Sequence, residues 1–274
     1  MEKIKAIFTD LDNTLLIDNF STTEENKEAI RKAAKAGIKV IPATGRALGD
    51  IPKDILNMPE IEYIVLANGA LVYEKKSKSF IFKDCMDKEK LCRLLSLPAM
   101  SDVCWFAMID GVSHYQKSLF ERIKGTEIYA LLDEFTGFDV VMEDDLLSAV
   151  KDEKTQVEKA VIFFKNAEHM YNAVNSAPLL LDFDCSNSFE YNIEMTKKGV
   201  NKAKGIAFLC EKLGISPKET VTIGDSGNDV DMLKFSPNSY AVENAMSTAK
   251  QAAKFLTVKN TQSAVAAVIE KYLQ

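Results

Sequence analysis

The sequence predicts an α/β fold, a Rossmann-like doubly wound parallel sheet with a second, α+β domain inserted into it. Short apolar strands alternate with amphipathic helices in the first and last thirds of the chain, which is the pattern of a parallel sheet. Between them the strands are longer and more aromatic. The 274 residues leave room for one or two domains. We therefore expect residues 1–83 and 191–274 to form the sheet domain and residues 84–190 the inserted domain.

The alternation begins at the N-terminus. Thr22 and Glu25 form a capping box in front of an amphipathic helix that stops at Gly37. A second helical stretch follows near 48–56. The strands expected in this third are 5–9 (KAIFT), 39–43 (KVIPA) and 63–67 (YIVLA). Because strand–helix–strand repeats imply right-handed crossovers, these strands should lie parallel.

The last third repeats this rhythm. A helix over 201–213 is closed by Gly214, a typical residue for a helix C-terminus. Further strands are expected at 220–223 (TVTI), 239–242 (SYAV) and 255–258 (FLTV), with helices around 230–234, 245–253 and 261–273. Both ends of the chain therefore complete one sheet.

The middle of the chain differs from both ends. It contains the apolar, aromatic segments VCWFAMID, VEKAVIFF, LLLDFD and FEYNIEM, with helices between them. The third segment runs into a D-x-D-x-S sequence at 182–186. We interpret these residues as a strand of the inserted domain with its two acids on one face.

Composition and charge narrow the function classes. The 34 basic and 40 acidic residues give a formal net charge of −6, which favours solubility and argues against a nucleic-acid partner. A local basic pocket for a phosphorylated small molecule is compatible with that charge. No window reaches the roughly 20 apolar residues of a membrane span, and the five cysteines contain no C-x-x-C pair. We expect a cytoplasmic monomer or homodimer with no membrane partner.

An acid pair, Asp10 and Asp12, directly follows the first strand. In an open parallel sheet the carboxyl ends of the strands face the ligand crevice. One acid there can bind Mg²⁺ and attack phosphorus, and the other can exchange a proton with the leaving oxygen. A turn capped by Asp12 and Asn13 would explain the pattern too. A calcium loop is disfavoured because Leu15 occupies the position of its glycine.

The next two strands also end in polar residues. The Thr44 hydroxyl, with backbone N–H groups near Gly45, can donate hydrogen bonds to a phosphoryl oxygen, although a helix N-cap would suit Thr44 equally well. Arg46 follows directly. Asn68 precedes a glycine after the third strand and offers both a donor and an acceptor, as it also would in a plain turn.

Two further polar clusters lie in the last third. The segment 197–205 (KKGVNKAKG) places lysines at a helix start, where a phosphate can bind, although a basic surface patch is an equal alternative. The segment 224–229 (GDSGND) follows the strand TVTI directly. Its Asp225, Asn228 and Asp229 offer oxygen ligands that suit Mg²⁺, and an Asx-rich turn is the alternative.

In this order the motifs DLDNT, ATGR, ANGA, GVNKAKG and GDSGND resemble those of the haloacid dehalogenase-like superfamily of aspartyl phosphohydrolases. Within it the chain is similar to the Cof-type sugar-phosphate phosphatases over essentially its whole length. The resemblance aligns the active lysine with Lys202, and Ala203 stands where such proteins often have glycine. It also implies that the inserted domain is a large α/β cap over the active site.

The resemblance implies a role for each acid. Asp10 would be the nucleophile that forms an aspartyl phosphate, and Asp12 the general acid and base. Mg²⁺ would lie between the Asp10 carboxylate, the Asp12 backbone carbonyl and Asp225, with Asp229 as a further ligand. The function implied is Mg²⁺-dependent hydrolysis of small phosphomonoesters, in particular sugar phosphates.

The remaining site residues would bind the substrate. Thr44, Lys202 and Asn228 would hold the phosphoryl oxygens. Hydroxyl groups of the leaving group would meet a set of polar residues that includes several from the cap: Arg46, Asn68, Ser186, Asn187, Ser188 and Glu190.

Other functions use similar residues. A phosphotransferase or phosphomutase would share the Asp10 chemistry but pass the phosphoryl group to a second sugar. A receiver-like signalling module also combines a strand-end aspartate, a threonine, a lysine and Mg²⁺, but it is far shorter and its acids are adjacent. A metal-dependent binding protein without turnover is the third alternative.

Overall fold

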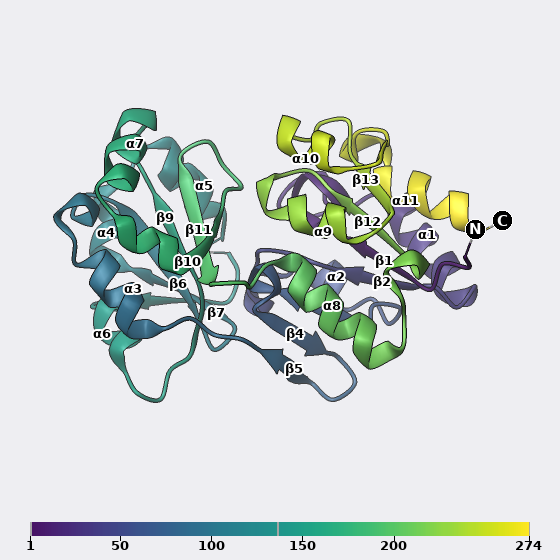
Figure 1. The fold of residues 1–274 in the computed structure, drawn as a ribbon, viewed down its shortest axis with the longest axis horizontal. Helices are drawn as coiled ribbons and strands as arrows, with labels where there is room; N and C mark the ends of the chain where they lie inside the picture. Colours follow the sequence, from purple (N-terminus) through teal and green to yellow (C-terminus); the bar gives the residue numbers. More distant parts are fainter. Residues whose placement is uncertain (1, 136, 274) are drawn as a thin grey trace. The chain divides into compact units, whose positions relative to one another are not determined.

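The computed structural model describes residues 2–135 and 137–273. The chain divides into two compact units. The core unit comprises residues up to 45, residues 52–82 and residues from 201 onward, and the cap unit comprises residues 46–51 and 83–200. Figure 1 shows the chain passing from the purple and blue strands of the core unit to the cap unit and returning to the core unit in its green and yellow last third.

The core unit is built on a parallel sheet of five strands in the order β14-β13-β12-β1-β2. These strands are β1 (Ala6–Thr9), β2 (Lys39–Pro42), β12 (Thr220–Gly224), β13 (Asn238–Ala241) and β14 (Phe255–Leu256). The inner strand β1, which lies between β12 and β2, is fully buried, as its apolar sequence predicts. Its register pairs Thr9 with Ile223 of β12, so these two strands end side by side. The predicted doubly wound α/β sheet is confirmed.

A second, three-stranded sheet extends the core unit. Strands β3 (Tyr63–Leu66), β4 (Leu71–Glu74) and β5 (Ser79–Lys83) form it, with β3 and β4 antiparallel. A parallel bridge between Ala43 and Val65 joins the end of β2 to β3. The third predicted strand, β3, therefore pairs in parallel with the end of β2 through this one bridge only. It then turns back directly into the antiparallel strand β4.

The helices of the core unit are α1 (Glu24–Lys35), α2 (Lys53–Leu56), α8 (Lys202–Leu213), α9 (Val230–Phe235), α10 (Ser247–Ala252) and α11 (Ala264–Ile269). The capping prediction for α1 is wrong by one residue, since the Thr23 side chain accepts from Asn26 N while the Thr22 hydroxyl donates to the Leu15 carbonyl. At the end of α8, Gly214 adopts the left-handed conformation, as predicted.

The cap unit contains a six-stranded sheet in the order β10-β11-β9-β6-β7-β8. Its strands are β6 (Cys104–Ile109), β7 (Val112–Gln116), β8 (Val140–Glu143), β9 (Val157–Phe163), β10 (Phe183–Ser186) and β11 (Asn192–Lys197). Its helices are α3 (Lys88–Leu95), α4 (Lys117–Arg122), α5 (Glu127–Phe135), α6 (Leu146–Lys151) and α7 (Ala167–Asn175). All strand pairs are antiparallel except β7 with β8.

One face of the cap sheet packs into an apolar cluster. Trp105, Ile162 and Phe164 belong to it, together with residues of α3, α6 and α7. The D-x-D-x-S sequence at 182–186 enters β10, and Asp182 lies 3.5 Å from Lys90. No helix in the described part of the chain is both long and apolar enough to cross a membrane.

The two units differ in extent from the predicted domains. Strand β11 pairs with β9 and β10 in the cap unit, whereas the predicted core domain resumes at residue 191. The reason is visible in its side chains, because Ile193 and Met195 lie in the apolar cluster of the cap unit. The predicted helix at 48–56 is interrupted at Pro52, and only its second half, α2, belongs to the core unit. We therefore propose a cap domain of 83–200 with the added segment 46–51.

Candidate active site

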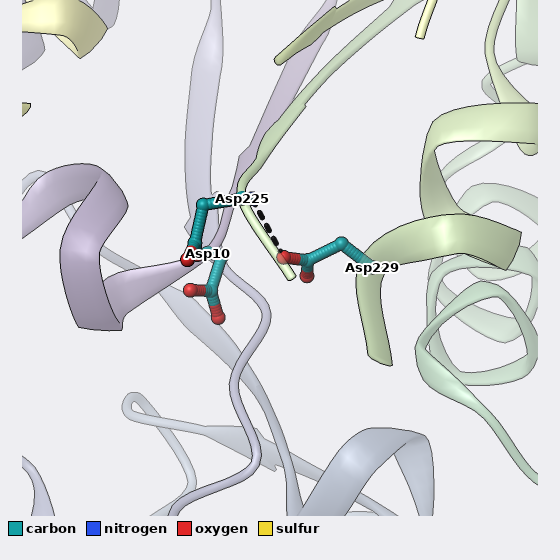
Figure 2. Close-up of side chains that lie close together, drawn as sticks. All are labelled: Asp10, Asp225 and Asp229. Atoms are coloured by element: carbon teal, nitrogen blue, oxygen red, sulfur yellow. Dashed lines mark hydrogen bonds between the residues drawn. The ribbon is translucent and has the colours of Figure 1, made fainter. Parts of the chain in front are cut away.

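Three aspartates meet at the carboxyl ends of β1 and β12. Asp10 follows β1, and its backbone N–H donates to the Ile223 carbonyl of β12 at 2.9 Å. Asp225 follows β12, and Asp229 lies one turn further along. One carboxylate oxygen from each of Asp10, Asp225 and Asp229 lies within 4.8 Å of the others, and all three residues are buried (Figure 2). The predicted meeting of these acids thus follows from two parallel strands that end together.

Lys202, the first residue of α8, neutralises part of this charge. Its Nζ lies 2.5 Å from Asp10 Oδ1 and 2.7 Å from Asp229 Oδ1, and its side chain is fully buried. A lysine is rarely buried unless it is paired, and here it has two carboxylates as partners. The structure therefore brings the predicted lysine and the acid cluster into one site.

Asp229 organises the turn after β12. Its Oδ2 accepts hydrogen bonds from the backbone N–H groups of Asp225 (2.9 Å, dashed in Figure 2) and Ser226 (3.0 Å). A Cβ at position 224 would lie 2.6 Å from Asp229 Cγ, so only glycine allows the turn to close this tightly. The Thr14 hydroxyl donates to Asp225 Oδ1 at 3.1 Å. Thr14 belongs to the DLDNT motif but was not among the predicted site residues.

Burial and the neighbouring carboxylates make Asp10 and Asp225 resist ionisation. Burial is the largest cause that raises the pKa of Asp10, and Lys202 opposes it. Burial, and then the charge of Asp229, raise the pKa of Asp225 to about 7. Although burial disfavours a charged lysine, the carboxylates of Asp10 and Asp229 raise the pKa of Lys202. Three carboxylates facing one ammonium leave an excess of negative charge that a divalent cation would balance.

The donor set of the cluster suits Mg²⁺. Every side-chain group of the three acids offers oxygen, the ligand type that this hard cation prefers. Asp12 is half-buried and its carboxylate is not one of the three. The resemblance assigns the metal to the backbone carbonyl of Asp12, and that assignment remains a prediction. The charge of Asp12 does reach the site, since it contributes to the raised pKa of Asp10.

The loops after β2 and β3 hold each other in place. The N–H of Thr44 donates to the Val65 carbonyl at 2.9 Å, and the Thr44 carbonyl accepts from Asn68 N at 3.0 Å. The Asn228 side chain donates to Asn68 Oδ1 at 3.3 Å, which links these loops to the acidic turn. Thr44 is fully buried. The predicted phosphate-binding residues Thr44, Asn68 and Asn228 thus belong to one hydrogen-bonded frame in the core unit.

Gly69 explains why the ANGA motif needs glycine. Its φ is +91°, and a Cβ at this position would lie 2.0 Å from the Asn201 carbonyl oxygen. The turn after β3 therefore presses against the start of α8, where Lys202 begins the helix. This close contact places the loop after β3 directly against the residue that precedes Lys202.

The other predicted substrate residues lie in the cap unit. Ser186 ends β10, and Asn187 is exposed and donates to the Phe189 carbonyl at 3.4 Å. Ser188, next in the chain, donates to Glu194 Oε1 at 2.7 Å. Arg46 is buried and also belongs to the cap unit, while Gly45 is the last core residue before it. That these cap residues bind substrate stays a prediction.

A buried ion pair in the cap unit was not predicted from the sequence. Lys159 Nζ of β9 lies 3.0 Å from Glu194 Oε2 of β11, and both side chains are less than a tenth exposed. Both residues stand in strands that are almost wholly buried, so the charged residues in the sequences VEKA and NIEM were the available signal.

Comparison with known proteins decides the family. The model of the haloacid dehalogenase-like hydrolase family matches residues 7–269. The chain belongs to this family. The resemblance drawn from the motifs is thereby confirmed, as is the prediction that the protein is an enzyme of the hydrolase class.

Individual relatives agree with this assignment. The Bacillus subtilis protein YcsE, named a 5-amino-6-(5-phospho-D-ribitylamino)uracil phosphatase, is 26% identical over 98% of this chain and 96% of its own. A haloacid dehalogenase-like hydrolase structure from B. subtilis superposes with a TM-score of 0.84 at 23% identity, covering 97% of this chain and 99% of that one. The structure titled subclass IIB sugar phosphatase BT4131 gives a TM-score of 0.79 at 20% identity, with 98% of both chains covered.

Proposed function

We propose that the protein hydrolyses small phosphomonoesters, in particular sugar phosphates, in a Mg²⁺-dependent reaction through an aspartyl phosphate. The observation that carries the proposal is the contact of Lys202 Nζ with both Asp10 Oδ1 and Asp229 Oδ1 inside the three-carboxylate cluster. A nucleophilic carboxylate has to be ionised, and burial raises the pKa of Asp10 and so opposes its ionisation. The lysine supports its ionised form.

A metal ion would complete the charge balance. Asp10, Asp225 and Asp229 would hold Mg²⁺, with the backbone carbonyl of Asp12 as a further ligand. When bound, the ion supplies positive charge that offsets the repulsion between the nucleophile and the phosphate dianion.

In the first step an oxygen of Asp10 forms a bond to phosphorus while the ester P–O bond breaks. Asp12 gives its proton to the departing alkoxide, so the alcohol leaves neutral. In the second step Asp12 takes a proton from water, and the water oxygen attacks the phosphorus. The bond between phosphorus and Asp10 breaks, inorganic phosphate leaves, and both acids return to their starting state. Thr44, Asn228 and Lys202 hold the phosphoryl oxygens throughout.

The proposed leaving group is a polyhydroxylated carbon chain or ring. Candidate partners for its hydroxyl groups are Arg46, Ser186 and Asn187. The name of the relative YcsE specifies a phosphate on a ribityl chain, and the BT4131 structure is titled a sugar phosphatase. Both support a sugar-like substrate for this chain.

The test is phosphate release from a panel of sugar phosphates, nucleotides and p-nitrophenyl phosphate, with Mg²⁺ and with EDTA. Asp10→Asn should lower turnover at least about a thousandfold, because it removes the nucleophile. Asp182→Asn is a matched control, since Asp182 begins the other D-x-D-x-S/T sequence of the chain and lies in the cap unit. Metal-dependent release that survives Asp10→Asn would refute the mechanism, and release only with an added sugar acceptor would indicate a transferase.

A further inference from the structure

A short piece of the chain near the phosphate-binding loop belongs to the cap unit. Residues 46–51 leave the core unit after Gly45 and return to it at Pro52. Only Gly45 separates Thr44 of the core unit from Arg46 of the cap unit. Since successive Cα atoms are about 3.8 Å apart, Arg46 stays within roughly 7.6 Å of Thr44, Cα to Cα, whatever the placement of the cap unit. Arg46 is thus a cap residue that the chain keeps beside the phosphate loop.

Backbone contacts fasten this segment to the cap unit. Leu48 N donates to the carbonyl of Gly111, in the turn between β6 and β7, at 3.1 Å. A Cβ on Gly49 would lie 2.8 Å from the Asp139 carbonyl oxygen, so the segment closes tightly on the residues before β8. These contacts come from two separate parts of the cap unit, and they fix the path of the segment.

Asp50 is the centre of the polar contacts. Its Oδ2 accepts from the Ser113 hydroxyl of β7 at 2.6 Å and from Ala47 N at 3.3 Å. Its backbone carbonyl accepts from Arg46 Nη1 at 2.8 Å. The guanidinium of Arg46 also lies over the Phe138 ring, 5.4 Å from its centre. Asp50 thus binds β7 through its side chain and Arg46 through its backbone carbonyl.

The burial of Asp50 shows that these contacts are not incidental. Asp50 is 3% exposed, and Oδ1 finds no hydrogen-bond partner among the described residues. Burial raises the pKa of Asp50, against the Ser113 hydrogen bond and the charges of Arg46 and Lys159. A buried carboxylate is unfavourable unless its partners are well placed. The burial of the Asp50 carboxylate between Ser113 and Arg46 therefore points to a role that offsets this cost.

We propose that Asp50 is a positioning residue for substrate recognition, which clamps the segment 46–51 to the cap unit and thereby sets the orientation of Arg46. The inference rests on the proposed function, in which Arg46 meets the hydroxyl groups of the leaving group. Asp50 itself touches no reacting atom. Its loss should weaken recognition of a polyhydroxylated leaving group and leave the chemistry at Asp10 unchanged.

The kinetic test compares Asp50→Ala and Asp50→Asn with wild type. Asp50→Ala should raise KM at least about tenfold for the best sugar phosphate of the panel, because a charge-assisted contact is lost. It should change kcat and KM for p-nitrophenyl phosphate less than twofold, since that ester offers no sugar hydroxyl groups. Asp50→Asn keeps an acceptor for Ser113 and should restore most of the affinity. Equal losses for both substrates would overturn the inference, because they would indicate general damage.

A double-mutant cycle separates a positioning role from an independent one. In an Arg46→Ala background, Asp50→Ala should add less than a further twofold to KM, because Asp50 acts through Arg46. If the two substitutions instead multiplied their separate effects on KM, the inference would be contradicted. The matched control is Asp145→Ala, because Asp145 accepts from the Ser148 hydroxyl at the same distance of 2.6 Å in the same unit. These two residues belong to the start of α6 and not to the segment 46–51, and Asp145 is exposed.

Hydrogen exchange tests the clamp without any turnover. The amides of Ala47 and Leu48 should lose protection in Asp50→Ala and Ser113→Ala and keep it in Asp145→Ala. Unchanged protection in both variants would overturn the inference even in an active enzyme. If the wild-type protein hydrolyses no phosphomonoester, the proposed function fails, and lost protection would still establish the clamp on Arg46.

Discussion

The buried carboxyl of Glu158 makes stability depend on pH in a calculable way. Glu158 lies where the register of β9 shifts against β6, and it is fully buried. Its Oε2 accepts from Gly111 N at 3.2 Å, and Oε1 has no hydrogen-bond partner among the described residues. Burial, with a smaller contribution from Asp110, raises the pKa of Glu158 from 4.5 to about 7. The cap unit therefore holds this group more stably as the neutral acid.

The magnitude follows from linkage. A pKa raised on folding means that the native state binds the proton more tightly, so its stabilising effect is complete below pH 4.5 and is lost as pH rises to about 7. At about 1.4 kcal/mol per pKa unit, the loss is about 3 kcal/mol. Glu158→Gln mimics the neutral acid and cannot ionise. Relative to wild type, the variant should therefore gain about 3 kcal/mol of unfolding free energy between pH 4.5 and pH 8.

The chain offers a selective probe for this measurement. Its single tryptophan, Trp105, is 8% exposed in the apolar cluster of the cap unit, so its fluorescence reports the unfolding of that unit. Urea unfolding would be followed at several pH values for wild type, for Glu158→Gln and for the exposed control Glu153→Gln. Parallel pH profiles for wild type and Glu158→Gln would refute the reasoning.

Three further predictions concern the core unit. Lys202→Met should lower phosphate release at least about a thousandfold, because Asp10 loses the charge that favours its ionised form, whereas Lys198→Met should retain activity. Gly69→Ala should cost at least about 2 kcal/mol in urea unfolding, and clearly more than Gly37→Ala, which shares a positive φ but has nothing within 4 Å. Mg²⁺ should raise the melting temperature of wild type and not of Asp225→Asn, since it binds only the folded cluster; equal shifts in both proteins would contradict the site.

Several site residues were predictable because strand order alone brings them together. Asp10 and Asp225 each follow an apolar strand, and parallel strands present their carboxyl ends at one edge. The position of Lys202 near the start of a helix was also predictable, from the helical pattern over 201–213 and the glycine that ends α8. Each of these signals, the apolar strand before an acid and the helical pattern that contains Lys202, is read from residues close together in the chain.

Other features depend on contacts that local patterns do not encode. The pairing of β11 with β9 moves a boundary that composition alone placed at residue 191. The role of Gly69 is set by the carbonyl of Asn201, which lies far along the chain. Asp50 lies in a stretch that was predicted as a helix, and only tertiary contacts such as its bond to Ser113 show that it belongs to the cap unit.

The sequence by itself determined the fold class and the family resemblance, because periodicity and motifs can be read from the chain alone, and through that resemblance it predicted the acids and the lysine of the site. The tertiary structure alone decided which side chains are buried, how Asp10, Asp229 and Lys202 pair, and to which unit the segment 46–51 belongs. Burial and charge pairing arise between segments distant in sequence. They set the pKa values and contacts on which the chemistry depends.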